Sequence, residues 1–261
     1  MEYKTIKYSF SDGIGKLVMS RPNELNALST QLFEEMIALL EELSKQPELR
    51  VLVLTGEGRA FCAGGDLQEM KAGFDDNFGF YAHMQLASRF TVALVDFPKP
   101  VIAAVNGAAT GAGMNVALAA DIAIASEKAK FSEIFGQVGL APDVGGTYLL
   151  PRIVGKAKAK ELIFSYRMVD AREALELGLV NRVVAPEDLE AAVMELAQKI
   201  ASGPTFAYGL AKKIINRSFE IDLNTALEME TMAQALAGNS GDHKEGVAAF
   251  FEKRPPVFKG K

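Results

Sequence analysis

The sequence predicts an α/β fold, because apolar runs of strand length alternate with stretches of helical periodicity. Three of these runs are each followed by a glycine-rich loop and then by a helical segment. From about residue 189 onward the strand-like runs stop and the pattern is almost wholly helical. We therefore expect a strand-and-helix core over residues 1–200 and a helical region over residues 201–261.

The first third of the chain predicts a β-hairpin, a helix and a buried strand, in that order. The hairpin has its strands at residues 5–10 and 14–19. Ser29 is a suitable N-cap for a helix in which apolar side chains recur at helical spacing over residues 32–43. The uninterrupted apolar run at residues 51–54 then predicts a strand that is buried on both faces.

Two further strand–loop–helix units follow in the middle of the chain. Residues 101–105 predict a second buried strand, and the small-residue loop 106–113 comes after it. Residues 114–120 have the pattern of a short buried helix, and residues 121–125 predict the next strand. The third glycine-rich loop, residues 140–146, opens another helix.

Composition and charge exclude several classes of function. The chain has 28 lysines and arginines against 33 aspartates and glutamates, a net charge of −5, which argues against a nucleic-acid or membrane partner. The most apolar region, residues 101–125, contains Asn106 and Asp121, so we interpret it as core and not as a membrane span. A single cysteine and a start without a signal-like segment favour a cytoplasmic location.

Histidine and cysteine limit the chemistry further. The only histidines are His83, in a helical pattern, and His243, in a polar turn, and we interpret both as structural or solvated. Cys62 follows a phenylalanine in an apolar stretch, which favours a small buried side chain. We therefore expect neither a metal site nor a Ser-His-Asp or Cys-His device.

The three glycine-rich loops are candidate anion sites, because a helix N-terminus leaves backbone N–H groups unpaired. The loop at residues 107–113 lacks the Rossmann spacing, and no Gly-Lys-Ser/Thr follows it as in a P-loop. Small residues also occur wherever a helix packs closely on a sheet. The loops by themselves therefore leave a functional and a structural interpretation open.

Motifs in these loops resemble those of the crotonase (enoyl-CoA hydratase/isomerase) superfamily, in the same order along the chain. Residues 59–67 resemble the first oxyanion-hole motif, residues 106–125 the second, and residues 142–147 a third segment. Further matches extend the resemblance over nearly the whole chain, at residues 21–22, 25–28 and 177–180. The resemblance implies a crotonase-like spiral of ββα units, C-terminal helices that assemble a homotrimer or a dimer of trimers, and an acyl-CoA thioester substrate. It implies no other cofactor, since coenzyme A is part of the substrate.

The same resemblance implies that two backbone N–H groups hold the thioester oxygen. In register these belong to Ala63 and Ala112, and donors at a helix start suit a developing negative charge. Asp66 is expected to cap the helix that follows it. The resemblance places the other substrate contacts at Ala27, Gly64, Gly65, Asp66, Leu67, Gly113, Asn115, Phe135 and Lys253.

The chain departs from the hydratase pattern at both catalytic glutamates. Asn115 and Phe135 occupy these two positions. A positioned acid or base contributes about 10²–10⁴-fold to a rate, so we expect little hydratase activity. Glu133 lies two residues from the second position, and on a strand its side chain faces either the site or the solvent.

Asp143 stands where isomerase branches of the family place a single catalytic acid, so we expect it to be the base, with a pKa raised by apolar surroundings. The alternative is a turn and capping role. A dehalogenase is disfavoured because Val92 stands where that branch needs histidine. A hydratase and a non-catalytic acyl-CoA-binding relative stay open as alternatives.

The C-terminal region carries two further expectations. Residues 250–254 resemble a segment that contacts coenzyme A across a subunit boundary, which assigns Lys253 to the nucleotide. Its helices have more apolar positions than one packed face needs, so some should be buried between subunits. Finally, residues 71–80 show no regular pattern and are expected to shape the acyl pocket.

Overall fold

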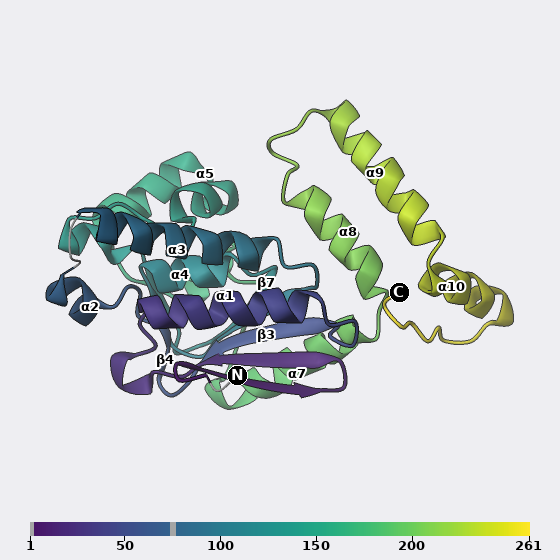
Figure 1. The fold of residues 1–261 in the computed structure, drawn as a ribbon, viewed down its shortest axis with the longest axis horizontal. Helices are drawn as coiled ribbons and strands as arrows, with labels where there is room; N and C mark the ends of the chain where they lie inside the picture. Colours follow the sequence, from purple (N-terminus) through teal and green to yellow (C-terminus); the bar gives the residue numbers. More distant parts are fainter. Residues whose placement is uncertain (1–2, 74–76) are drawn as a thin grey trace.

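The computed structural model describes residues 3–73 and 77–261, and it confirms a mixed α/β fold (Figure 1). The larger sheet has the strand order β1-β2-β3-β5-β7-β10 and is parallel except for the hairpin pair β1–β2. Its strands in this order are Ile6–Ser11, Ile14–Met19, Val51–Gly56, Val101–Val105, Ile122–Ser126 and Arg182–Val184.

A second sheet has the order β4-β6-β8-β9, with strands Ala60–Cys62, Ala108–Thr110, Lys130–Ser132 and Val169–Asp170. Three pairs of strands follow one another along the chain: β3–β4, β5–β6 and β7–β8. In each pair the first strand belongs to the larger sheet and the second to the smaller sheet, and helical structure follows the pair. These three repeats are the predicted ββα units. The segments that follow β4 and β6 leave the small sheet at the same end, because β4, β6 and β8 are parallel neighbours. The third glycine-rich loop follows η2 and reaches α4 through the hydrogen bond from Asn115 to the Asp143 carbonyl.

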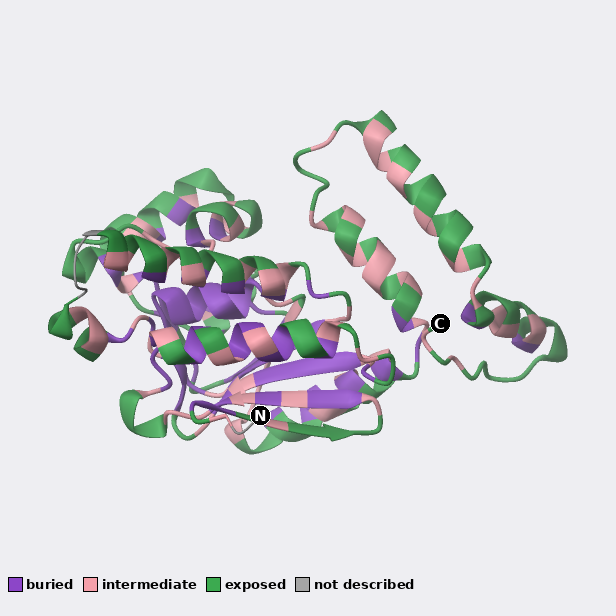
Figure 2. Ribbon diagram, in the orientation of Figure 1, coloured by how far each residue is buried: buried purple, intermediate pink, exposed green. Residues whose placement is uncertain are grey.

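The larger sheet is covered on both faces. Leu52 and Leu54 pack into the core on the side of α1 (Thr30–Ser44) and α3 (Asn77–Val95). Val51 and Val53 pack on the opposite side, against α7 (Leu189–Ala201). The alternation of side chains along a strand produces these two cores, and Figure 2 shows the central strands buried. The strand predicted at residues 51–54 is therefore confirmed as buried on both faces.

The remaining helices of the core are short, apart from α5. They are η1 (Pro22–Glu24), α2 (Leu67–Ala72), α4 (Ala112–Leu118), η2 (Ile134–Val138), α5 (Gly146–Ser165), α6 (Ala171–Glu176) and η3 (Pro186–Asp188). The helix predicted at residues 114–120 begins two residues earlier, because Gly111 serves as its N-cap. Residues 71–80 are not wholly irregular as expected, since α2 ends at Ala72 and α3 begins at Asn77; residues 74–76 lie outside the described part.

Helices α8 (Thr205–Ile215), α9 (Leu223–Gly238) and α10 (Gly241–Glu252) form an arm, in which α8 contacts the core and α9 and α10 stand away from it (Figure 1). No residue of α9 is buried, and Phe250 on α10 is 78% exposed. The arm therefore leaves large apolar side chains uncovered within one chain. No helix in the described ranges has the length and apolar character needed to cross a bilayer.

Candidate active site

The first two glycine-rich loops meet at the N-terminus of α4. Gly113 in the first turn of α4 packs directly on β4, and a Cβ atom there would lie 2.1 Å from the carbonyl oxygen of Cys62. Only glycine fits at such a distance. The close packing brings the backbone around Gly64 beside the amide of Ala112, since a Cβ atom on Gly64 would lie 3.6 Å from that nitrogen.

Ala112 is the first residue of α4, and its N–H has no hydrogen-bond acceptor among the described residues. Such an orphan donor is expected at a helix start, where the helix dipole also favours negative charge. The predicted role of Ala112 as an amide donor therefore agrees with its geometry.

The predicted role of Ala63 as the second amide donor is wrong. Its N–H donates to the carbonyl oxygen of Leu25 at 3.0 Å, so it cannot also face a thioester. Gly65 forms a parallel bridge with Leu28, in which the flanking bonds run from Leu28 N to Gly64 O and from Asp66 N to Leu28 O. Neighbouring amides of an extended segment point to opposite sides, so the N–H of Gly65 points away from this bridge and has no acceptor in the described chain.

Asp66 is a structural residue, as its predicted cap role requires. Its carboxylate accepts from the backbone N–H groups of Gln68 and Glu69 at the start of α2 and pairs with Arg21 at 2.7 Å. Burial acts to raise the pKa of Asp66, but the hydrogen bonds and charge of Arg21 and the two amides outweigh it and lower the pKa. Arg21 also donates to the carbonyl oxygen of Ala27, which ties the segment before α1 to the first loop.

A buried polar cluster surrounds Asn115 of α4. Asn115 is fully buried, and its Nδ2 donates to the backbone carbonyl oxygen of Asp143 at 2.9 Å and to Oε2 of Glu133 at 3.5 Å. The start of α5 presses on the same carboxamide, because a Cβ atom on Gly146 would lie 2.3 Å from Asn115 Nδ2. Phe135, also buried, packs its ring edge near Gly111.

The two carboxyl groups of this cluster have no cationic partner, since neither forms an ion pair with a lysine or arginine in the part of the chain described. Burial raises the pKa of Asp143 to about 6, against the lowering effect of its own backbone amide. Burial raises the pKa of Glu133 to about 7; the Asn115 hydrogen bond lowers it and the charge of Asp143 raises it further. The predicted rise for Asp143 is confirmed.

Asp143 and Glu133 differ in how far a substrate can reach them. Asp143 is only partly buried and precedes Val144, which has a left-handed φ of 47°. A β-branched residue in this region is a conformational outlier of the kind that clusters at functional sites. Glu133 is 1% exposed and lies between β8 and η2. It faces the cluster and not the solvent, a choice that the sequence left open.

Other predicted residues lie outside the cluster. Leu67 is exposed at the start of α2. Lys253 is the C-cap of α10, and α10 and α2 lie at opposite ends of the molecule (Figure 1). A single chain therefore does not bring Lys253 to the site. His83 contacts the Thr30 hydroxyl at 2.9 Å, and Cys62 is fully buried, as expected for structural residues. The described residues contain no cluster of three or more potential metal ligands.

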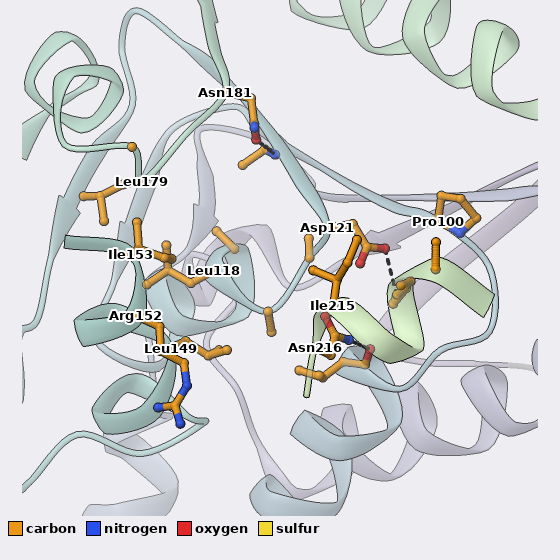
Figure 3. A pocket seen from close by; sticks show the side chains of 18 of the residues that line it. Pro100, Leu118, Asp121, Leu149, Arg152, Ile153, Leu179, Asn181, Ile215 and Asn216 are labelled. Atoms are coloured by element: carbon orange, nitrogen blue, oxygen red, sulfur yellow. Dashed lines mark hydrogen bonds and ion pairs between the residues drawn. The ribbon is translucent and has the colours of Figure 1, made fainter. Parts of the chain in front are cut away.

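A separate groove of about 510 Å³ lies between the core and α8 (Figure 3). Apolar side chains such as Leu118 and Ile153 line much of it. Asp121 accepts from the Val101 N–H at 2.7 Å and pairs with Lys212 of α8 at 2.8 Å. Because its charged groups are already paired, we interpret this groove as the anchor of α8 and not as a reactive site.

The fold is an α/β architecture built from ββα units, and two backbone amides without acceptors among the described residues lie where its first two loops meet. The chain belongs to the enoyl-CoA hydratase/isomerase family: residues 9–261 match the family of that description. The resemblance to the crotonase superfamily is thus confirmed.

Two relatives and one solved structure illustrate the family match. The chain is similar to the 1,2-epoxyphenylacetyl-CoA isomerase of Escherichia coli K12, with 41% identity over 254 residues, 95% of this chain and 96% of that protein. It is 40% identical over 264 residues to a probable enoyl-CoA hydratase of Rhodobacter capsulatus, covering 100% of both. The crystal structure of an enoyl-CoA hydratase from Bacillus anthracis matches with a TM-score of 0.94 and 38% identity, over 99% of this chain and 100% of that one.

Proposed function

We propose that this protein is an enoyl-CoA isomerase that moves a double bond in an acyl-CoA thioester with Asp143 as its only base. The observation that carries the proposal is the placement of Asp143 beside Asn115 in the first turns of α4, as a partly exposed residue whose carboxyl group pairs with no cation among the described residues. A pKa of about 6 leaves it ionised at neutral pH and stronger as a base than an ordinary aspartate. Asn115 and Phe135 supply no second acid at the positions that a hydratase uses.

In the proposed reaction, the carbonyl oxygen of a 3-enoyl thioester binds to the N–H groups of Gly65 and Ala112. Asp143 removes a proton from C2, and the electron pair moves into a dienolate whose oxygen carries the negative charge. The two amides stabilise that charge, and one such donor typically contributes about 2.7–4 kcal/mol. Asp143 then returns the proton at C4, so one carboxyl is sufficient and the product is a 2-enoyl thioester.

Hydration of a 2-enoyl-CoA is the second candidate, because the R. capsulatus relative is named a probable hydratase. Hydration needs one group to activate water and another to protonate the α-carbon. Among the described residues, Glu133 is the only other carboxyl in the cluster, and its burial works against contact with a substrate water. A non-catalytic acyl-CoA-binding role predicts binding of both thioesters and conversion of neither.

We also propose that chains associate through the arm, as a trimer or a dimer of trimers, and that Lys253 contacts the coenzyme A nucleotide of a neighbouring subunit. The uncovered apolar side chains of α9 and α10 support association. The position of Lys253, remote from the site of its own chain, supports a contact in trans.

The deciding experiment compares wild type with Asp143→Asn on 3-enoyl-CoA and 2-enoyl-CoA substrates, with product analysis by mass. We expect isomerisation to fall by about 10²–10⁴-fold in the variant, with thioester binding retained. Asp188→Asn, an exposed aspartate that makes no side-chain cap bond, is the matched control. Wild-type isomerisation by Asp143→Asn, or efficient hydration of 2-enoyl-CoA by wild type, would show that the assignment is wrong.

A further inference from the structure

Three buried polar atoms without a hydrogen-bond partner lie in one cluster. Among the described residues four buried side-chain oxygen or nitrogen atoms lack a partner, and three of them are Asn115 Oδ1, Glu133 Oε1 and Asp143 Oδ1. A buried polar atom without a partner costs about 1–3 kcal/mol. Three such atoms on neighbouring residues therefore indicate a missing proton or ligand contact and not unrelated defects.

The orientation of the Asn115 carboxamide is fixed by its neighbours. Only its nitrogen can face the carbonyl oxygen of Asp143, because two oxygen acceptors cannot bond to each other. The two protons of Nδ2 are then directed to Asp143 O and to Glu133 Oε2. Asn115 Oδ1 is left without a partner among the described residues and needs a donor, which an ionised carboxylate cannot supply.

We propose that Glu133 is a positioning residue: as a neutral carboxylic acid it pairs with the Asn115 carboxamide through two hydrogen bonds and thereby holds the Asp143 segment in place. In this pair, Asn115 Nδ2 donates to one carboxyl oxygen of Glu133, and the protonated oxygen of Glu133 donates to Asn115 Oδ1. Both Asn115 Oδ1 and Glu133 Oε1 are then satisfied. The role of Asp143 as the base that this pair holds in place rests on the proposed function.

The surroundings of Glu133 favour its neutral form. Neither α4 nor η2 contains a titratable side chain, and α5 contains none before Tyr148. The titratable side chain of β8, the strand before Glu133, is the exposed Lys130. Tyr166, at the end of α5, packs its ring on η2 at Gly136. Burial raises the pKa of Glu133 to about 7, and the charge of Asp143 adds to this rise.

Ionisation of Glu133 has two consequences for Asp143. The hydrogen bond to Asn115 Oδ1 is lost, so the carboxamide no longer holds the Asp143 carbonyl from a fixed position. A second negative charge also appears beside the base. We therefore expect isomerase activity to rise as Asp143 ionises near pH 6 and to fall as Glu133 ionises near pH 7.

The test compares Glu133→Gln with Glu133→Ala over pH 5–9, because glutamine can form the same two hydrogen bonds with Asn115 and cannot ionise. We expect Glu133→Gln to keep kcat within about threefold at pH 6 and to lose the alkaline decline. Glu133→Ala should lower kcat about 10–100-fold at every pH with KM little changed, because the base is misplaced and not removed. Glu127→Gln, an exposed glutamate, is the control.

Three outcomes would overturn the proposal. If Glu133→Gln loses as much activity as Glu133→Ala, the proton of Glu133 takes part in the chemistry itself. If Glu133→Gln keeps the alkaline decline, another group causes it. If Glu133→Ala behaves as wild type, Glu133 positions nothing.

An infrared measurement separates this proposal from the proposed function. The protein without substrate should show at pH 6 the carbonyl bands of the protonated acids Glu133 and Asp143, and the Glu133 band should be missing from Glu133→Gln but not from Asp143→Asn. This readout requires no turnover, so it tests the Glu133–Asn115 pair even if Asp143→Asn shows that the isomerase assignment is wrong. A wild-type spectrum without the Glu133 band at pH 6 contradicts the neutral pair.

Discussion

Asp121 follows the C-terminal end of α4, and Asp143 lies beside Asn115 of the same helix, but the two carboxyl groups have opposite surroundings. Asp121 has Lys212 at 2.8 Å and a backbone N–H at 2.7 Å, so its charge is compensated. Asp143 has no cation, and one of its carboxylate oxygens has no partner. Burial raises the pKa of both, but at Asp121 the ammonium of Lys212 acts against that rise. The comparison indicates that the compensated carboxylate holds the fold together and the uncompensated one is available for chemistry.

The largest expected effect on stability comes from breaking the compensated pair. Lys212→Met leaves Asp121 without a cation. The side chains of Lys212 and Asp121 are 9% and 24% exposed, and removing one member of such a largely buried pair costs up to about 3 kcal/mol. We expect a loss of that size in the free energy of urea unfolding at pH 7, with unchanged isomerase activity per folded molecule. Lys213→Met, at the exposed neighbouring position of α8, is the control. A loss below about 1 kcal/mol would place Lys212 among ordinary surface charges.

The uncompensated carboxylate should have the opposite effect. The folded pKa of Asp143 is about 6, raised from 3.8. The contribution of protonated Asp143 to the free energy of unfolding is therefore fully present below pH 4 and is lost as the pH rises through 6. Asp143→Asn avoids this loss, so we expect it to be about 2 kcal/mol more stable than wild type at pH 8 and equal at pH 4.

Urea unfolding at the two pH values checks this prediction, and Asp121→Asn sharpens it. That second variant should be destabilised at pH 8, because it removes the partner of Lys212. If Asp143→Asn and Asp121→Asn change the free energy of unfolding equally at pH 8, the two carboxyl groups do not differ in charge compensation.

A smaller effect is expected in the arm, where apolar side chains and not charges lack partners. Met232→Glu places a charge on the uncovered surface of α9, where the wild-type side chain is 67% exposed. We expect at least a tenfold weaker association, about 1.4 kcal/mol, in sedimentation experiments at micromolar concentration. A wild-type chain that sediments as a monomer under these conditions would contradict association through the arm.

The smallest expected effect concerns Lys253. An exposed lysine contributes little in high-dielectric surroundings, so Lys253→Ala should weaken coenzyme A ester binding about two- to fivefold at low salt, and less at high salt. Titration with a CoA thioester measures this directly. An unchanged dissociation constant at low salt would remove Lys253 from the nucleotide site.

Much of the fold could be predicted from local patterns. Ser29 caps α1 by accepting from Leu32 N–H at 3.2 Å, and β5 spans the predicted residues 101–105. The oxyanion donors show where such prediction stops. Ala63 and Gly65 belong to the same motif, and nothing local distinguishes their amides. The bridge between Gly65 and Leu28 decides which of them is free.

The sequence by itself determined the order of the ββα units and the loops that carry the site, because hydrophobic periodicity and glycine placement act over a few residues. The tertiary structure decided which aspartate is compensated, since Lys212 lies 91 residues from Asp121. It also turned Glu133 inward, where Asn115 lies 18 residues away in the chain. Charge compensation and burial depend on such distant neighbours, and so does the pKa of each carboxyl group.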